Sequence, residues 1–180
     1  MNKKIVILNG SPRLTGNTVG IIDAFTEGAE KAKNEVKRFD LQELEIHPCK
    51  GCYMGGQDPN SPCVQKDDME QIYRAVGNAD IVVLASPLYY WSFSGQLKCA
   101  FDRLFALAEI NSDHHHPQKD AILLMAAESF DIEEIKFYYN KLLDHIEWNN
   151  LGMVFIGGVR DIGDIKNKDL KEAKDLGLSI

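Results

Sequence analysis

Short apolar runs divide the chain and predict its strands. Residues 5–8, 81–85, 121–127 and 153–156 are rich in Val, Ile, Leu or Met and show no polar alternation. Such runs are typical of strands that are buried on both faces of a parallel sheet. Residues 35–39 alternate apolar and polar side chains instead, which favours a fifth strand at the edge of the sheet.

Between these runs, apolar positions recur at steps of three and four residues, as on one face of a helix. The recurring positions are Val19, Ile22, Phe25, Ala29 and Ala32, then Leu97, Phe101, Leu104 and Ala108, then Ile132, Ile135, Tyr139, Leu142 and Ile146. Alternating strands and helices predict a doubly wound α/β fold. Five strands with a weak second strand fit the flavodoxin-like parallel order 2-1-3-4-5, with helices on both faces.

One domain is expected over residues 1–180, because this length can bury one substantial core and no Pro-, Gly- or Ser-rich linker divides the chain. Residues 46–66 form a long irregular insertion, which is expected to be functional or mobile. In doubly wound sheets, ligands bind beyond the carboxyl ends of the strands, where the strand order reverses. The expected site therefore lies between the loops after the first and third strands.

The loop after the first strand reads NGSPRLTGNT, residues 9–18. A helix is expected to begin near Thr18, and its unpaired N–H groups and positive dipole end attract a phosphate. The candidate ligands are Ser11, Arg13, Gly16, Asn17 and Thr18. Neither a P-loop ending nor Gly-x-Gly-x-x-Gly is present, so a phosphate monoester fits better than a triphosphate or pyrophosphate. A plain turn with Asn17 as the helix cap is the alternative.

The loop after the third strand carries three consecutive aromatic residues, Tyr89, Tyr90 and Trp91. Pro87 stiffens the exit from the strand and is expected to leave the following N–H groups free to face a ligand. Three adjacent aromatic side chains cannot all enter one core, so at least one is expected to be exposed or to stack on a flat ligand. Core or dimer-interface aromatics are the alternative. A phosphate site beside a stacking surface favours FMN.

Composition and hydropathy limit the classes of partner that the protein is expected to bind. The formal net charge of −7 and the isoelectric point near 5.2 argue against nucleic acid. No apolar run approaches the roughly 20 residues that span a bilayer, and the N-terminus lacks a signal-peptide core, so a cytoplasmic location without a membrane partner is expected. Four cysteines in such a chain are more plausibly free thiols or ligands than disulfides.

Three motifs resemble the flavodoxin-like NAD(P)H-dependent FMN reductases, in the branch related to iron–sulfur flavoproteins. They read GSPRLTGNT, SPLYYWSFSGQLKCAFDRL and GGVRDIGDIKNKDLKEAKDLG, and the resemblance covers nearly the whole chain. It implies FMN as the cofactor and NADPH or NADH as the electron donor. The residues implied for the phosphate are Ser11, Arg13, Asn17 and Thr18, for the isoalloxazine Pro87, Leu88, Tyr89 and Tyr90, and for the rim Ala127, Glu128 and Ser129. Gly16 and Trp91 complete the expected cofactor site.

Three cysteines fall in the irregular insertion. Cys49 and Cys52 have Cys-x-x-Cys spacing, and Cys63 follows. Cluster-bearing relatives in the resembling branch have a third cysteine three residues after the second, where this chain has Gly55. Three thiolates are one short of the usual four for a [4Fe–4S] cluster, so no metal is expected. A cluster, a zinc site on these cysteines and a redox dithiol of Cys49 and Cys52 are the alternatives.

Together these features predict an enzyme, an FMN-dependent NAD(P)H oxidoreductase that reduces a quinone, flavin, nitro or azo compound. No catalytic acid, base or nucleophile is expected, because the flavin carries the chemistry. The first alternative is a flavodoxin-like or iron–sulfur-flavoprotein-like electron-transfer protein, and the second is an FMN-binding protein without turnover. The expected partners are a small-molecule electron acceptor and further copies of the chain, in a homodimer or homotetramer.

Overall fold

The computed structural model describes residues 2–180 and contains one five-stranded parallel sheet in the order β2-β1-β3-β4-β5. The strands are β1 (Lys4–Asn9), β2 (Glu35–Asp40), β3 (Ile81–Pro87), β4 (Asp120–Ala126) and β5 (Asn149–Ile156). The helices are α1 (Asn17–Lys31), the short 3-10 helix η1 (Leu41–Glu43), α2 (Met69–Asn78), α3 (Gly95–Arg103), α4 (Phe105–Ala108), α5 (Glu133–Ile146) and α6 (Asn167–Leu178). The predicted flavodoxin-like fold and strand order are confirmed.

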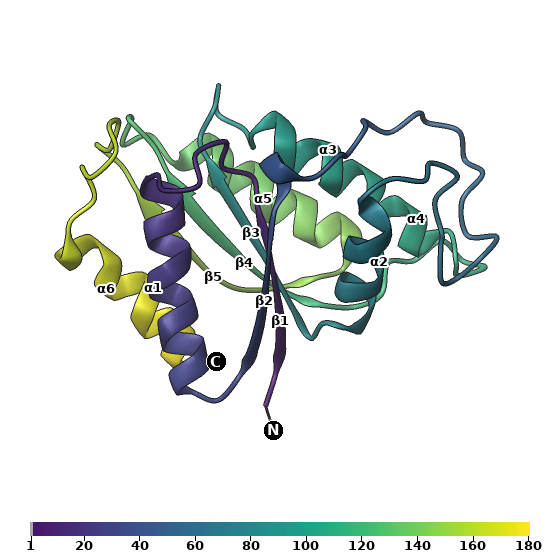
Figure 1. Ribbon diagram of the computed structural model, residues 1–180, viewed down its shortest axis with the longest axis horizontal. Coiled ribbons are helices and arrows are strands. Elements are labelled where there is room, and N and C mark those ends of the chain that lie inside the picture. Colours follow the sequence, from purple (N-terminus) through teal and green to yellow (C-terminus); the bar gives the residue numbers. More distant parts are fainter. Residues whose placement is uncertain (1) are drawn as a thin grey trace.

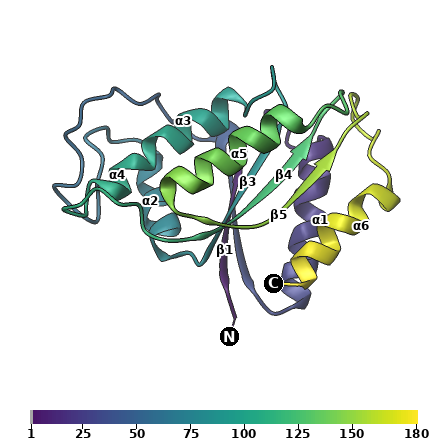
Figure 2. The ribbon, with the colours of Figure 1, turned by 180° about the vertical axis from the view of Figure 1, so that it is seen from behind.

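Helices cover both faces of the sheet (Figures 1 and 2). α1 and α6 lie on one face, and α2, α3, α4 and α5 lie on the other. Successive residues of β1 alternate between the two cores: Ile5 and Ile7 belong to the core under α1 and α6, and Val6 and Leu8 to the opposite one. Both faces of this strand are buried, which is why its sequence is apolar throughout.

The helices α2 and α6 were not among those that the apolar spacing predicted, and two predicted elements have different bounds. The single helix expected from Leu97 to Ala108 is interrupted at Leu104, where the N–H groups of Leu104 and Leu107 each bond a carbonyl three residues earlier instead of four. β5 begins at Asn149, four residues before the expected start at residue 153, because backbone pairing with β4 extends beyond the apolar run. Apolar pattern alone does not mark such a polar strand end.

The glycines of α1 and α6 allow these helices to touch. A Cβ at Gly28 would lie 2.2 Å from the Lys174 carbonyl oxygen, and one at Gly177 would lie 2.2 Å from that of Phe25. Gly28→Ala is therefore expected to lower the free energy of unfolding by about 1–3 kcal/mol, because the helices must move apart. Urea unfolding measures this change.

Gly77→Ala in α2 is the matched control for this substitution. Apart from the chain neighbours and the backbone of its own helix, no atom of the described chain lies within 4 Å of the added Cβ, so the helix propensity of Ala predicts a gain of up to about 1 kcal/mol. Equal losses in the two variants would contradict the close-approach argument.

The predicted irregular stretch, residues 46–66, contains no helix or strand; we call it the cysteine loop. It extends to one side of the sheet, next to α2 and α4 (Figure 1). Within residues 2–180, no helix combines the length and apolar character that a membrane crossing requires.

Candidate functional site

A cavity of about 300 Å³ lies at the carboxyl ends of the strands, where the strand order reverses between β1 and β3. It is lined by residues from the loops that follow β1, β3, β4 and β5: Ser11, Arg13, Gly16, Asn17, Thr18, Pro87, Leu88, Tyr89, Ala126, Ala127, Glu128, Val159 and Arg160. Ten of the thirteen residues expected at the cofactor site are in this set; Tyr90, Trp91 and Ser129 are not. We call this hollow the strand-end cavity.

The start of α1 presents unpaired donors to the strand-end cavity. Gly16 is the N-cap in extended backbone, without a side-chain cap bond. The N–H groups of Asn17, Thr18 and Val19 have no acceptor among the described residues. Asn17 is the first helical residue, so its alternative assignment as the helix cap is wrong. The unpaired N–H groups and the helix dipole favour an anion at this point.

The side chains of the loop after β1 have defined partners. The Ser11 hydroxyl contacts both the N–H and the carbonyl of Arg13 and so shapes the turn. One terminal nitrogen of Arg13 donates to the Arg160 carbonyl at 3.1 Å, and its other N–H groups remain open. The Asn17 amide donates to the Asp161 carbonyl and accepts from the Ile165 N–H. The Asn17 side chain therefore orders the loop after β5, and its backbone N–H is the group left for an anion.

Gly10 sets the distance between the loop after β1 and the start of α3. A Cβ on Gly10 would lie 2.6 Å from both Leu97 Cβ and Ser94 Oγ. The Ser94 hydroxyl donates to the Gly10 carbonyl at 2.7 Å and accepts from the Leu97 N–H, as the cap of α3. The hydroxyl thus holds the two loops of the strand-end cavity together.

The loop after β3 corrects one prediction. The Leu88 N–H donates to the Ala126 carbonyl and the Tyr89 N–H to the Ser92 carbonyl, so these donors are not free for a ligand. The expectation that they are free after Pro87 is wrong, because neighbouring backbone takes them. The N–H groups of Tyr90 and Trp91 have no acceptor in the described chain.

Tyr90 and Trp91 form the tip of a two-residue turn between Tyr89 and Ser92. Their φ angles are +47° and +58°, and Tyr89 and Ser92 exchange two backbone hydrogen bonds. This is the pattern of a type I′ turn, where Asn-Gly is the usual pair. The Tyr90 side chain is 95% exposed and Trp91 56%. Two bulky residues held with positive φ cost backbone free energy, and such strain is concentrated at functional sites.

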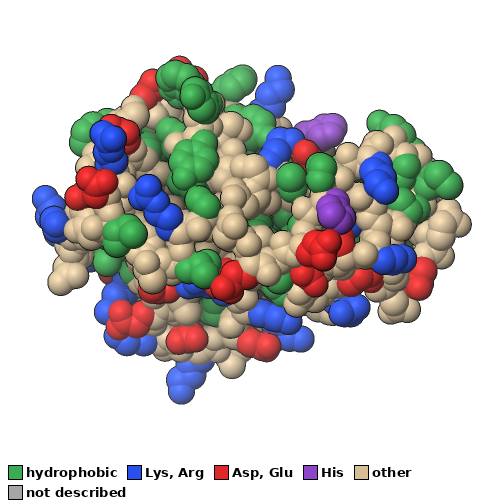
Figure 3. Space-filling view, turned by 45° about the horizontal axis from the view of Figure 1, so that its top comes forward, with side chains coloured by type: hydrophobic (Ala, Val, Ile, Leu, Met, Phe, Trp, Pro, Cys, Tyr) green, Lys and Arg blue, Asp and Glu red, His purple; other side chains and the backbone are tan. Residues whose placement is uncertain are grey.

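The loops after β4 and β5 close the remaining side. The Ala127 N–H donates to the Ile156 carbonyl, and the Val159 N–H donates to the Ala127 carbonyl. An exposed ion pair joins Glu128 to Arg160 across the rim at 3.6 Å. Exposed hydrophobic side chains gather along this edge of the molecule (Figure 3).

The sequence prediction missed three lining residues: Ala126, at the end of β4, and the pair after β5, Val159 and Arg160. The glycine pair directly after β5 is the signal that could have found Val159 and Arg160. A Cβ at Gly157 would lie 2.7 Å from the Ser129 carbonyl oxygen, and Gly158 has a φ of +74°. A glycine pair at a strand's carboxyl end marks a close approach between loops.

Comparison with known proteins decides the family. Residues 3–160 match the family described as NADPH-dependent FMN reductase. The chain belongs to the NADPH-dependent FMN reductase family. This FMN reductase family member is 31% identical over 182 residues to an iron–sulfur flavoprotein of Archaeoglobus fulgidus, covering 98% of this chain and 78% of that protein. It is 28% identical to one of Methanocaldococcus jannaschii, covering 98% and 95%.

Solved structures share the fold of this FMN reductase family member. An NAD(P)H:quinone oxidoreductase from Methanothermobacter marburgensis aligns with a TM-score of 0.74 and 19% identity, over 99% of this chain and 97% of that one. An FMN-dependent NADH-azoreductase from Bacillus anthracis, in complex with FMN, aligns with a TM-score of 0.70 and 14% identity, over 98% of both chains. At these identities the likeness concerns the fold.

The strand-end cavity has the donors that the phosphate of FMN requires. Three unpaired N–H groups at a helix start lie beside a partly open guanidinium, and both kinds of donor suit phosphate oxygens. Gly16 permits close approach, since a Cβ there would already lie 3.1 Å from Arg13 Cβ. The residues present therefore fit the phosphate end of FMN.

The cysteine loop does not fit an iron–sulfur cluster, the group that the names of the two relatives imply. Within residues 2–180, no group of three or more His, Cys, Asp or Glu side chains is placed to hold a metal ion. At position 55, a Cβ would lie 2.1 Å from Glu109 Oε2 and 2.9 Å from the Pro62 carbonyl oxygen, so this packing leaves no room for a further ligand. We therefore derive no step through an iron–sulfur cluster.

Proposed function

We propose that this protein binds FMN in the strand-end cavity and acts as an NAD(P)H-dependent oxidoreductase. The observation that carries the proposal is the set of unpaired N–H groups at Asn17, Thr18 and Val19, next to Arg13 and within one cavity with the loop after β3. Membership of the NADPH-dependent FMN reductase family and the names of the structural neighbours support it.

Bound FMN would supply hydride acceptance from NAD(P)H and electron delivery to an acceptor. The chain would bind the phosphate at the start of α1 and through Arg13. The backbone of residues 87–89 and 127–128 would fix the plane of the ring. The exposed turn at Tyr90 and Trp91 would shape the place where NAD(P)H and then a quinone, flavin, nitro or azo compound approach. No side chain is assigned a proton-transfer step.

An anaerobic titration tests the proposal. The FMN-loaded protein is mixed with NADPH and, separately, NADH while the visible spectrum is recorded. We expect the oxidised-flavin absorbance to bleach in a single two-electron step and to return when a quinone is added. Failure to retain FMN after reconstitution, or no bleaching with either nucleotide, would contradict the proposal.

The second candidate function is electron transfer between proteins. The name that the two relatives described above share, iron–sulfur flavoprotein, favours it. Stepwise one-electron reduction by dithionite, with little response to either nucleotide, would support this candidate in the same titration. A homodimer or homotetramer and a cytoplasmic location remain predictions that follow from the resemblance and the sequence.

A substitution that relieves the strained turn is expected to stabilise the protein and to weaken binding of the acceptor. Tyr90→Asn together with Trp91→Gly is expected to raise the free energy of unfolding by about 1–2 kcal/mol, because Asn-Gly suits a type I′ turn. The same change is expected to raise the KM for an aromatic acceptor about fivefold, since stacking contributes about 1 kcal/mol. Chemical unfolding and steady-state kinetics measure the two effects.

Phe137→Ala is the matched control for the turn: Phe137 is also exposed, but it lies on α5, which contributes no residue to the strand-end cavity, whereas Tyr89, next to the turn, lines it. It should leave the KM unchanged. An unchanged KM in the turn variant as well would show that the two aromatic rings do not contact the acceptor.

A further inference from the structure

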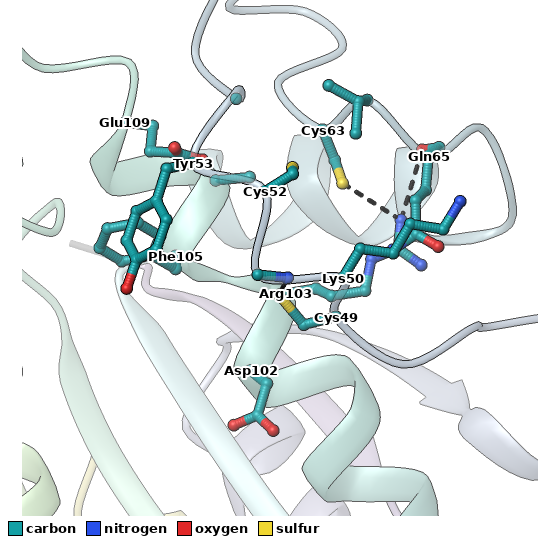
Figure 4. Close-up of a pocket in the computed structure, with 14 residues that line it drawn as sticks. Cys49, Lys50, Cys52, Tyr53, Cys63, Gln65, Asp102, Arg103, Phe105 and Glu109 are labelled. Atoms are coloured by element: carbon teal, nitrogen blue, oxygen red, sulfur yellow. Dashed lines mark hydrogen bonds between the residues drawn. The ribbon is translucent and has the colours of Figure 1, made fainter.

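A second cavity, of about 420 Å³, lies under the cysteine loop and shares no lining residue with the strand-end cavity. Its walls come from the cysteine loop and from α3 and α4 (Figure 4). The lining residues that carry the chemistry are Cys49, Lys50, Cys52, Cys63, Arg103 and Glu109. The proposed FMN chemistry uses none of them.

Arg103 lies at the wall of the second cavity with its side chain fully buried. Its terminal nitrogens pair with the Asp67 carboxylate and donate to the His47 and Gln65 carbonyls. One of them also donates to Cys63 Sγ at 3.5 Å, the contact drawn in Figure 4. Its Nε–H is buried and has no partner among residues 2–180. A buried, incompletely satisfied cation at a cavity wall favours an anionic group beside it.

Cys63 is the cysteine that this cation contacts. Burial raises the pKa of the Cys63 thiol, but the nearby Gln65 N–H and the Arg103 guanidinium, which donates to Sγ, outweigh burial, and the pKa lies below the usual range. The side chain is partly exposed, so a small molecule can reach it. Reactive cysteines are found where a cationic group contacts the sulfur and the thiol is partly accessible.

The loop packing brings further thiols to the same cavity. Gly55 and Gly56 seat the loop on Glu109, since a Cβ at either position would lie about 2 Å from an oxygen of that residue. Cys49 and Cys52, just before this contact, are both exposed and line the cavity. Figure 4 shows the Cys52 side chain directed toward the part of the cavity that holds Cys63. A nucleophilic thiol and a second thiol therefore share one space.

We propose that this cavity is a thiol–disulfide exchange site, in which Cys63 attacks a small disulfide and Cys52 resolves the product. The Cys63 thiolate forms an S–S bond to one half of the disulfide R–S–S–R, whose own S–S bond breaks and releases R–S⁻. Cys52 gives its proton to water and attacks Cys63 Sγ, forming the Cys52–Cys63 disulfide and releasing the second R–S⁻. The two cysteines lose two electrons in total, and the small disulfide gains them.

Exchange with glutathione disulfide tests the proposal on the full chain, with mass spectrometry of acid-quenched samples and no flavin readout. Near neutral pH, Cys63 is expected to react at least about threefold faster than Cys49 or Cys99, although Cys49 is more exposed. The wild-type protein is expected to end as the Cys52–Cys63 disulfide. Cys52→Ser should accumulate the glutathione adduct on Cys63, because the resolving thiol is missing.

Cys49→Ser is the matched control and should behave as the wild-type protein does. Cys63→Ser should lose the fast reaction. Reaction at Cys63 that is no faster than at Cys49 would overturn the proposal. So would a Cys52→Ser protein whose adduct on Cys63 persists no longer than in the wild type. None of these outcomes depends on whether FMN binds.

Discussion

Arg103→Met is expected to lower the free energy of unfolding by about 3–5 kcal/mol. The substitution removes the partner of Asp67, whose side chain is only 3% exposed, and leaves a buried carboxylate without a counter-charge. It also frees the carbonyls of His47 and Gln65, which position the cysteine loop. Urea unfolding monitored by circular dichroism measures the loss.

Lys98→Met is the matched control, on the same helix as Arg103. Lys98 pairs with Asp102 at 2.5 Å, but both side chains are more than 40% exposed. The loss expected for an exposed pair is at most about 1 kcal/mol. Similar losses in the two variants would mean that the Arg103 pair is not effectively buried, and that the cysteine loop opens readily in solution.

FMN is expected to bind at least about 100-fold more tightly than riboflavin, which lacks the phosphate. The unpaired N–H groups at the start of α1 and the Arg13 guanidinium are the donors that distinguish the two ligands. Each hydrogen bond to a charged group contributes about 1.5–3 kcal/mol, so two are enough for this ratio. Fluorescence titration of the apoprotein gives both dissociation constants.

A comparison of two arginines on the rim distinguishes a direct contact with the FMN phosphate from long-range electrostatic attraction. Arg13→Ala is expected to weaken FMN binding about tenfold and to leave riboflavin binding unchanged. Arg160→Ala removes the same charge from a side chain that pairs with Glu128, and is expected to change FMN binding less than about threefold. Equal effects would indicate that long-range attraction, rather than a specific contact, favours the phosphate.

The sequence predicted the fold well because its signals are local. The apolar run at β1 and the alternation at β2 each reflect how many faces of the strand are buried, and that number follows from position in the sheet. The anion-binding role of the loop after β1 was likewise predictable from the sequence. Glycines and hydroxyl side chains before a helix have few structural uses other than a turn or an anion site.

The rest depended on hydrogen-bond partners that the sequence does not identify. The N–H groups of Leu88 and Tyr89 looked free in sequence, but Ala126 and Ser92 accept their hydrogen bonds. The amide of Asn17 looked like a ligand or a cap, but it bonds to residues 161 and 165, more than 140 positions away. Arg103 gave no signal, because a charged residue near a helix end usually faces solvent.

The hydrogen bonds made by the Asn17 side chain join the loop after β1 to the last part of the chain. The family match ends at residue 160. The residues that follow are bonded to the side chain of Asn17, and the backbone N–H of Asn17 faces the strand-end cavity. The next helix, α6, packs closely against α1 at Gly28 and Gly177. Residues 161–166 are thus tied to the residue that is proposed to bind the phosphate, and a protease that cuts there is expected to act more slowly when FMN is bound.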